Sequence, residues 1–327
     1  MQILITGGAG FIGSHLADCL AYKTDASLVV LDNLSTGRKA NLRRIDDDRL
    51  TLIKGDIRDE ETTIKAVKEA DVVYHLAAAV GVEKIVENPL ESLHTNLHGT
   101  ENVLQAAAED GTPTFVASSS EVYGKSDDLP YSEQDDRVIG PTTTSRWSYS
   151  TAKAADEFLA LGYHDKHDLP VVVGRFFNIV GPRQSGQYGM VIPTFVEQAL
   201  AGKPLTVYGD GEQTRSFTHV REASRVVHEL MKEPNAVGDV FNIGTRNAVS
   251  INTLAEQVIK ITGDDSDITH IPFEEVYGPD FEEPEQRTPD LSKLHRTLGW
   301  EPNSELTEII EDVVRERRPE RTVVDDE

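Results

Sequence analysis

Tyr149 and Lys153 form a Tyr-x-x-x-Lys pair in the segment YSTAK. On a helix, residues four positions apart lie on one face, so the phenol and the ammonium would project together. A phenol, with an ordinary pKa of about 10, is a poor base near neutral pH. A nearby ammonium and the positive charge of an oxidised nicotinamide would favour the phenolate. The pair therefore predicts a proton-transfer site beside a nicotinamide, although Tyr/Lys pairs are also common on protein surfaces.

A second reactive segment, SSSEVYG, follows a predicted strand at residues 118–124. Doubly wound sheets bind ligands at the carboxyl ends of their strands, which is where this segment would lie. The hydroxyl of Ser119 could there hydrogen-bond the substrate oxygen that Tyr149 deprotonates. Glu121 follows two positions later, so its carboxylate should project to the same side as Ser119, toward the substrate.

A glycine-rich turn, GGAGFIG at residues 7–13, separates a predicted strand from a predicted helix. Its glycines would allow a pyrophosphate to approach the backbone, and the helix N-terminus would supply N–H donors. Asp32 ends the next strand, where a carboxylate accepts hydrogen bonds from ribose hydroxyls and repels a 2′-phosphate, so NAD is predicted over NADP. The expected cofactor contacts are Gly7, Gly10, Phe11, Ile12, Gly13, Asp32, Asn33, Asp56, Ile57, Ala77, Tyr149 and Lys153.

Two of these cofactor assignments have plain structural alternatives. Asp56 could reach the adenine region, or it could cap a helix that begins in GDIRDEE. Ala77 could let the cofactor lie close to the backbone, or it could reflect ordinary tight packing. Both residues stay on the list of candidate contacts.

These residues need a scaffold, and the first half of the chain alternates strand-like and helix-like segments. Runs of Val, Ile and Leu without clean alternation are typical of parallel strands covered on both faces. Their alternation with helices predicts an α/β fold with a Rossmann-type, doubly wound parallel sheet. The expected strands are 2–6, 27–31, 50–54, 71–76, 114–118 and 170–176, with helices that include 11–20, 91–109 and 149–167.

Beyond this half the pattern loosens into loops rich in Gly, Pro and Gln. We predict an NAD-binding Rossmann domain at 1–177, a smaller α/β substrate domain at 178–315 and a tail at 316–327. The substrate domain would hold helices near 191–201, 220–231 and 251–262. Its segment near 240–245 contains the apolar run VFNI and could return to the main sheet.

The composition is strongly acidic, with 32 Lys and Arg against 56 Asp and Glu and a net charge of -24. Nucleic acid and anionic membranes would repel such a chain, so neither is an expected partner. Because the acids are spread along the sequence, we favour adaptation to high intracellular salt over ordinary acidity. The single cysteine, Cys19, and the lack of a signal-peptide pattern favour the cytoplasm.

Together the motifs resemble the extended short-chain dehydrogenase/reductase superfamily, in its nucleotide-sugar epimerase/dehydratase/decarboxylase branch. The likeness covers roughly residues 1–315 through the order and spacing of TGGAGFIGSHL, HLAA, SSSEVYG, YSTAK, RFFNIVGPR, LTVYGDGEQTRSFTHV, FNIGT and RTPDLSKLHRTLGWEP. The resemblance implies a retained NAD and a catalytic trio of Ser119, Tyr149 and Lys153. It also implies a homodimer packed through long helices of the Rossmann domain, and no metal ion is expected.

The same resemblance implies a nucleotide-sugar substrate, most plausibly linked to UDP. Asn178 would contact its diphosphate, and Arg215 and Arg287 would clamp it, since guanidinium groups meet phosphate oxygens bidentately. Tyr208 would lie near the nucleotide base. Ser120 and Arg183 complete the expected substrate contacts.

The family shares a first step in which the sugar 4-hydroxyl is oxidised to a ketone, with Tyr149 taking the proton. Family dehydratases resemble Thr-Asp-Glu where this chain has Ser119-Ser120-Glu121, so dehydration is disfavoured. Ser-Glu before Val-Tyr-Gly, together with the segment SRWSY at 145–149, looks more like UDP-glucuronate decarboxylases, and Glu121 joins the expected catalytic residues. UDP-glucose 4-epimerase is the main alternative. A 4,6-dehydratase, an NAD(P)H-dependent reductase and a non-catalytic NAD sensor are more distant ones.

Overall fold

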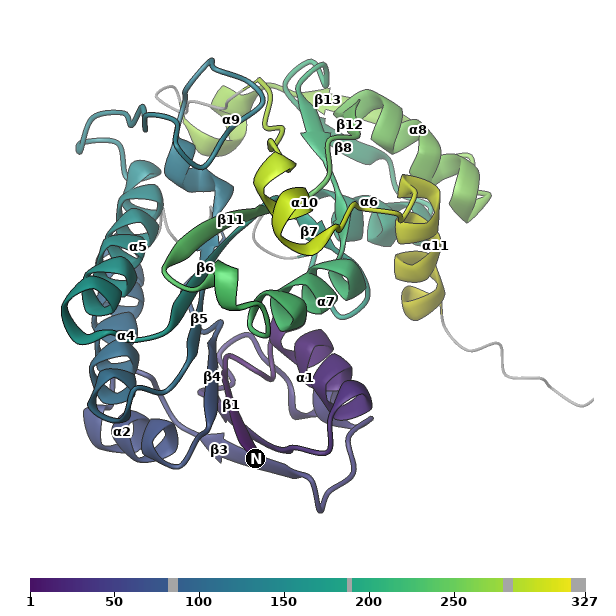
Figure 1. The fold of residues 1–327 in the computed structure, drawn as a ribbon. Coiled ribbons are helices and arrows are strands. Elements are labelled where there is room, and N and C mark those ends of the chain that lie inside the picture. Colours follow the sequence, from purple (N-terminus) through teal and green to yellow (C-terminus); the bar gives the residue numbers. More distant parts are fainter. Residues whose placement is uncertain (82–87, 187–189, 279–284, 319–327) are drawn as a thin grey trace, which may run out of the picture.

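The computed structural model describes residues 1–81, 88–186, 190–278 and 285–318 (Figure 1). A seven-stranded parallel sheet forms its centre, in the order β11-β6-β5-β4-β1-β2-β3. The strands are β1 (Gln2–Thr6), β2 (Ser27–Asp32), β3 (Leu50–Lys54), β4 (Val72–His75), β5 (Thr114–Ser119), β6 (Val171–Phe176) and β11 (Asp239–Ile243). This confirms the predicted doubly wound sheet of Rossmann type.

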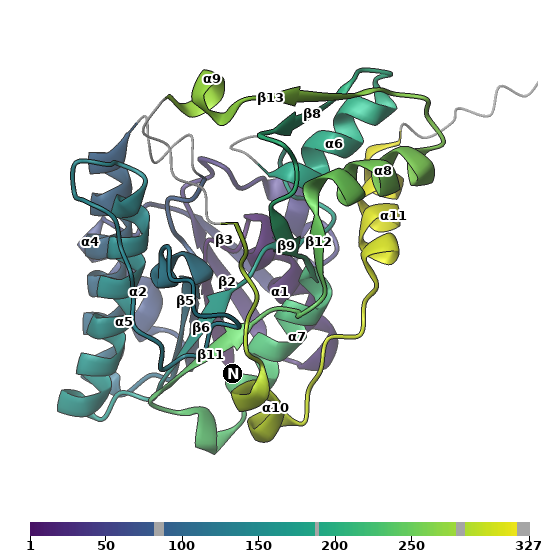
Figure 2. The same ribbon diagram turned by 90° about the horizontal axis from the view of Figure 1, so that it is seen from above.

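Helices cover both faces of the sheet, which is why most of its strands are continuously apolar. One face carries α2 (Glu60–Lys68), α4 (Pro89–Asp110) and α5 (Trp147–His167), and the other carries α1 (Phe11–Lys23) and α7 (Val220–Leu230) (Figure 2). Each face has its own buried apolar cluster. Short 3-10 turns, η1 (Lys39–Leu42), η2 (Ser120–Tyr123) and η4 (Pro234–Ala236), complete this part of the fold.

A smaller layer lies beyond the carboxyl ends of the strands. Three two-stranded sheets pair β7 (Ile179–Val180) with β10 (Thr218–His219), β8 (Leu205–Tyr208) with β13 (Ile268–Ile271), and β9 (Thr214–Ser216) with β12 (Ala248–Ser250). Helices α6 (Val191–Leu200), α8 (Ile251–Thr262) and α11 (Leu306–Arg317) enclose a separate apolar core. Two short helices, α9 (Phe273–Tyr277) and α10 (Ser292–Leu298), lie between these elements in the sequence.

The second half of the chain does not form one continuous domain. β11 pairs with β6 in the main sheet, and α7 buries Val220, Ala223 and Leu230 in the same cluster as α1. Helix α7, expected within the mainly substrate-binding half, leads into β11 and packs on the sheet that this strand extends.

Helix α11 also continues through Arg317, two residues into the segment predicted as a tail. Residues 319–327 of that tail lie outside the described residues. Among the described helices, none is long and apolar enough to cross a membrane.

Candidate active site

A cavity of about 370 Å³ opens at the carboxyl ends of β1, β2, β4 and β5, within the size range of ligand pockets. It lies where the strand order reverses between β1 and β4, the position at which doubly wound sheets bind nucleotides. We call it the cofactor cavity. The expected cofactor residues that line it are Gly7, Gly10, Phe11, Ile12, Gly13, Asp32, Asn33, Ile57, Ala77, Tyr149 and Lys153.

The glycine-rich turn is shaped for close backbone approach. Gly7 has a φ of +70°, and a Cβ at this position would lie 2.8 Å from the backbone of Ala77, which follows the end of the neighbouring strand β4. Helix α1 begins at Phe11, and Gly10, its N-cap, offers no side-chain acceptor to the first N–H groups. These groups therefore remain available to a phosphate, as a dinucleotide site requires.

Asp32 is buried at the end of β2, against the glycine-rich turn. Its carboxylate accepts hydrogen bonds from the backbone N–H groups of Ala9, at 3.0 Å, and Leu34, at 2.8 Å. Burial raises the pKa of Asp32, and these backbone donors oppose that rise. Because a carboxylate has about four acceptor positions, it can still accept hydrogen bonds from ribose hydroxyls.

Asp56 is placed differently from either expectation. Its carboxylate accepts hydrogen bonds from Arg58, at 2.7 and 2.9 Å, and from Asn33, at 3.1 Å. The hydrogen bonds from Arg58 hold the pKa of Asp56 well below its usual range. Asp56 is not among the described residues that line the cofactor cavity, and the N-cap of α2 is Asp59, which accepts from Thr62. The structure therefore supports neither the adenine contact nor the helix cap.

A second cavity, of about 410 Å³, adjoins the first and is named here the substrate cavity. The two share several lining residues, among them Ser119, Tyr149 and Asn178. A group that reacts with both a cofactor and a second ligand must face both cavities. Ser119 and Tyr149 lie at that junction, whereas Lys153 faces the cofactor cavity.

The environment of Tyr149 differs from the one expected. Burial raises the pKa of its phenol above the ordinary value and the charge of Glu121 raises it further, while a hydrogen bond with Ser119 lowers it. The Lys153 ammonium donates to the Ala117 carbonyl, at 2.9 Å, and to Asp156, at 3.0 Å. Lys153 is thus paired with a carboxylate, and the chain's own groups together raise the pKa of the Tyr149 phenol.

The three consecutive serines have separate surroundings. Ser119 lies at the end of β5, and its hydroxyl accepts the backbone N–H of Glu121 at 3.2 Å. Ser118 donates to Glu157 at 2.5 Å. Ser120 is 4% exposed and is not among the described residues lining either cavity, so the structure does not support its expected contact with substrate. Its position at the start of η2 turns it away from both cavities.

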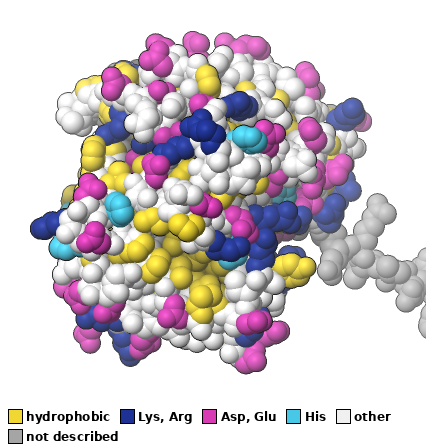
Figure 3. Space-filling model, in the orientation of Figure 1, with side chains coloured by type: hydrophobic (Ala, Val, Ile, Leu, Met, Phe, Trp, Pro, Cys, Tyr) yellow, Lys and Arg dark blue, Asp and Glu magenta, His cyan; other side chains and the backbone are white. Residues whose placement is uncertain are grey.

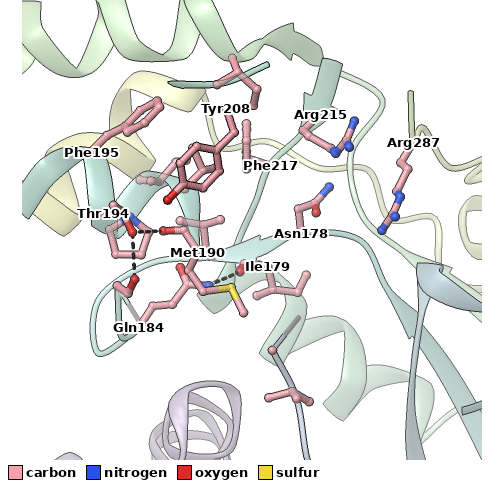
Figure 4. Close-up of a pocket in the computed structure, with 18 of the residues that line it drawn as sticks. Asn178, Ile179, Gln184, Met190, Thr194, Phe195, Tyr208, Arg215, Phe217 and Arg287 are labelled. Atoms are coloured by element: carbon pink, nitrogen blue, oxygen red, sulfur yellow. Dashed lines mark hydrogen bonds between the residues drawn. The ribbon is translucent and has the colours of Figure 1, made fainter. Parts of the chain in front are cut away.

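The far side of the substrate cavity carries most of the other expected substrate residues. Figure 4 shows Asn178 between Arg215 and Arg287, with Tyr208 across the cavity from them. The guanidinium of Arg215 donates to the carbonyls of Thr214, at 2.7 Å, and Glu285, at 3.2 Å. Asn178 donates to the Ser216 carbonyl at 3.0 Å. Backbone contacts therefore fix both polar side chains at the wall of the cavity.

Glu121 is the negative centre of this group. It forms an ion pair with Arg287, and a second with Arg146 at 3.6 Å. Burial alone would raise its pKa, but the charges of Arg287 and Arg146 and the more distant Arg215 lower it to about 2. Glu121 is therefore an ionised carboxylate at neutral pH, held beside the Tyr149 phenol by arginines.

Arg146 lines the substrate cavity and was not among the residues expected to bind substrate. It is buried, and its guanidinium stacks on the Trp147 ring with 5.2 Å to the ring centroid. The sequence feature that could have identified it is its position three residues before Tyr149, in a segment that resembles decarboxylases. Its place about one turn before the reacting phenol puts its charge in the substrate cavity.

Arg183 corrects another expectation. Its guanidinium pairs with Asp18 of α1 at 2.5 Å, and its backbone N–H donates to Glu316 of α11 at 2.6 Å. It is not among the described residues lining either cavity. With this side chain turned toward α1, the structure does not support a substrate contact for Arg183, which instead links the main sheet layer to the last helix.

Comparison with known proteins places this geometry in context. The family model described as GDP-mannose 4,6 dehydratase matches residues 4–313. UDP-N-acetyl-alpha-D-glucosaminuronate decarboxylase of Bacillus cytotoxicus is 43% identical over 303 residues, covering 92% of this chain and 93% of the relative. UDP-glucuronic acid decarboxylase 3 of Arabidopsis thaliana is 38% identical over 319 residues, covering 94% and 86%.

Among solved structures, a variant of UDP-glucuronic acid 4-epimerase from Bacillus cereus superposes with a TM-score of 0.86 and 29% identity. It covers 97% of this chain and 98% of its own, and it was solved with UDP-4-deoxy-4-fluoro-glucuronic acid and NAD. The similarity therefore spans both cavities and the elements that form them.

Proposed function

Since the chain belongs to the GDP-mannose 4,6-dehydratase family, we propose that it removes carbon dioxide from the sugar of a UDP-linked uronic acid. The single observation that carries this proposal is the Glu121 carboxylate, held between Arg287 and Arg146 at the wall of the substrate cavity. The two relatives described above, which match over most of the chain, are decarboxylases of UDP-linked uronic acids.

The cofactor cavity fits NAD. Gly7 and the uncapped start of α1 would receive the pyrophosphate, and Asp32 would accept hydrogen bonds from the adenosine ribose. When bound, NAD supplies a hydride acceptor for the C4 position of the sugar and later returns the hydride. The cofactor would thus be regenerated in each cycle and need not leave.

Tyr149 and Ser119 perform the proton transfer of the oxidation step. Both lie at the junction of the cavities, so a sugar 4-hydroxyl in the substrate cavity can meet the phenol oxygen and the serine hydroxyl together. Tyr149 takes the hydroxyl proton, and Ser119 holds the sugar oxygen through a hydrogen bond. The resulting 4-ketone makes a carboxylate at C6 a β-keto acid, which loses carbon dioxide readily.

The arginines provide the anion binding that this substrate needs. A diphosphate fits Arg215 and Arg287 at the wall of the cavity, because guanidinium groups bind phosphate oxygens bidentately. Arg146, nearer to Tyr149, is placed for the C6 carboxylate. A neutral hexose has no group that would require a third arginine at this position.

Glu121 would manage the proton that replaces the lost carboxylate at C5. Its pKa of about 2 keeps it ionised while the arginines hold it. A substrate anion that attracts Arg287 or Arg146 weakens that hold, so the carboxylate gains affinity for a proton. Glu121, directly or through a water, can then deliver this proton to C5.

The experiment is a substrate panel with a matched pair of variants. Wild type is incubated with NAD and UDP-glucuronate, UDP-N-acetylglucosaminuronate or UDP-glucose, and products are identified by mass and NMR. We expect carbon dioxide and a UDP-pentose from a uronate. Glu121→Gln should slow carbon dioxide release by roughly 10²-fold, within the usual range for acid–base groups, while NAD reduction by substrate persists. Asp127→Asn, the same change at an exposed acid nearby, should behave as wild type.

The second candidate is a 4-epimerase, which the structural similarity to UDP-glucuronic acid 4-epimerase favours. It uses the same oxidation at C4, followed by rotation of the keto sugar and return of the hydride to its other face. Interconversion of UDP-glucose and UDP-galactose, with no carbon dioxide from either uronate, would overturn the decarboxylase proposal and establish the epimerase.

We further propose a homodimer built on the outer faces of α4 and α5. Both helices are long and lie side by side at one side of the molecule (Figures 1 and 2). Phe158 of α5 is 71% exposed and Leu90 of α4 is 66% exposed, which is unusual for large apolar side chains on helices. Thr151, Ala155 and Gly162 recur around Phe158 at helical spacing and would permit close helix packing.

We also propose that the protein works in a cytoplasm of high salt. The support is the net charge of -24 and the free thiol of Cys19, the single cysteine of the chain. Acidic side chains are spread over the face seen in Figure 3 rather than gathered in one patch. Screening by salt would relieve their mutual repulsion.

A further inference from the structure

Helix α5 carries a third polar residue on the face of Tyr149 and Lys153. Asp156 follows at positions i+7 and i+3 from them, so all three side chains project toward the sheet. Asp156 is 0% exposed and Lys153 is 3% exposed, and their charged groups lie 3.0 Å apart. The Lys153 ammonium also donates to the Ala117 carbonyl at the end of β5. We propose that Asp156 is a positioning residue, which fixes the Lys153 ammonium against β5 and offsets its charge beneath Tyr149.

The carboxylate of Asp156 is the first member of a buried polar row. The Thr100 hydroxyl of α4 lies beside it and is 3.0 Å from Nε2 of His75. Nδ1 of His75 is 2.8 Å from the Thr6 hydroxyl, which accepts the backbone N–H of Ala77 at 3.2 Å. The row therefore runs from the reacting helix to the wall of the cofactor cavity.

The charges around this row identify Lys153 as the partner that matters. Burial lowers the pKa of His75 to about 3, so this imidazole is neutral and supplies no positive charge. Glu157, the next acid on α5, is paired with Arg175 of β6 at 2.7 Å. Burial raises the pKa of Asp156, and the Lys153 ammonium opposes that rise. A buried carboxylate is costly unless it is paired, so Asp156 and Lys153 hold each other in place.

The pairing of Asp156 with Lys153 affects the pKa of the Tyr149 phenol. The groups that act on Tyr149 are Glu121 and Asp156, which raise its pKa in addition to burial, and Ser119, which lowers it. With Asp156 in place, the charge of Lys153 is largely neutralised within its own helix. Replacing the carboxylate by an amide would remove one negative charge and leave the ammonium uncompensated near the phenol. Both changes favour the phenolate.

The test is the pH dependence of kcat for Asp156→Asn and Asp156→Glu, with whichever UDP-sugar the wild type turns over. The inference rests on the C4 oxidation of the proposed function and not on decarboxylation, so it is tested equally well if the enzyme is an epimerase. For Asp156→Asn we expect the acidic limb of the kcat profile to move to lower pH by about half a unit or more, since nearby charges shift pKa values on this scale. A limb that stays in place would overturn the proposal.

Asp156→Glu covers the case in which the amide variant does not fold. It keeps the charge but lengthens the side chain, so the ammonium is displaced. We expect kcat to fall about ten-fold or more with KM nearly unchanged and the acidic limb of the profile retained, since misplaced reacting groups lose rate steeply. A kcat equal to that of wild type would show that the position of Lys153 does not depend on Asp156.

Discussion

At the scale of single residues, the site combines groups whose charges oppose one another. Tyr149 is a buried phenol with the Glu121 carboxylate nearby, and its pKa lies above the ordinary value. Glu121 in turn is kept ionised by arginines. The two proton-transfer tasks are thus assigned to different groups: Tyr149, once its own phenol proton has left, acts at the 4-hydroxyl, and Glu121 acts at C5.

Removing the phenol oxygen should abolish the first of these tasks. We expect Tyr149→Phe to lower kcat by about 10²- to 10⁴-fold, because the hydroxyl transfers a proton and contributes little to binding. Calorimetry should show nearly unchanged affinity for UDP-sugar, since the arginines and Asn178 stay in place. A variant that keeps more than about a tenth of the wild-type rate would show that another group is the base.

The other residue-scale prediction concerns cofactor choice. Asp32 is buried against the glycine-rich turn, and its carboxylate faces the cofactor cavity. Asp32→Ala should weaken NAD binding and narrow the preference for NAD over NADP. The ribose hydroxyls would lose a hydrogen-bond acceptor, and the 2′-phosphate of NADP would no longer be repelled by the carboxylate. Fluorescence titration with both dinucleotides measures this. Asp47→Ala, at an exposed acid that is not among the described residues lining the cofactor cavity, is the matched control and should alter neither affinity.

At the scale of elements, the central sheet was predictable because its strands are apolar runs between helical segments. The small strands were not, since β7 and β10 have two residues each and carry no periodicity. The docking of α7 on the main sheet depends on β11 pairing with β6, a contact between distant parts of the chain. The apolar run VFNI suggested that this segment could return to the main sheet, but local pattern did not indicate that α7 would pack there as well.

The same limit applied to the site. Ser119 and the glycine-rich turn were predicted because their motifs follow strands, and Tyr149 was predicted from its helical spacing with Lys153. The positions of Arg146, Asp156 and Arg183 follow from side-chain direction in the folded chain, and spacing alone does not fix that direction. Arg183, for example, follows the segment RFFNIVGP, but its side chain turns to Asp18 of α1.

The proposed dimer is tested at this scale. Phe158→Asp places a charge in the middle of the exposed face of α5, where a partner helix would have to desolvate it. We expect wild type to sediment with the mass of two chains and the variant with the mass of one. Tyr22→Asp, at a 91% exposed aromatic of α1, is the matched control and should remain dimeric. A monomeric wild type would refute the proposed interface.

At the scale of the whole molecule, the charge is the dominant feature. The chain has 32 Lys and Arg against 56 Asp and Glu, so 24 acidic side chains would remain without a basic partner even if every Lys and Arg formed an ion pair. Buried pairs such as Arg175 with Glu157 are little affected by salt, whereas repulsion among exposed acids is screened. Salt should therefore stabilise the fold while leaving the internal network intact.

The last prediction follows from this difference between buried ion pairs and exposed acids in their response to salt. The screening length shrinks from about 10 Å at 0.1 M salt to about 3 Å at 1 M, which removes most repulsion between neighbouring surface acids. We expect the melting temperature to rise by about 5 °C or more between 0.1 and 2 M potassium chloride, equivalent to roughly 3 kcal/mol for a chain of this size. An uncharged osmolyte such as sucrose, at matched osmolality, is the control, because it strengthens burial without screening charge. If sucrose raises the melting temperature as much as potassium chloride does, preferential exclusion from the protein surface accounts for the effect. If potassium chloride does not raise the melting temperature, the acidic surface is not an adaptation to salt.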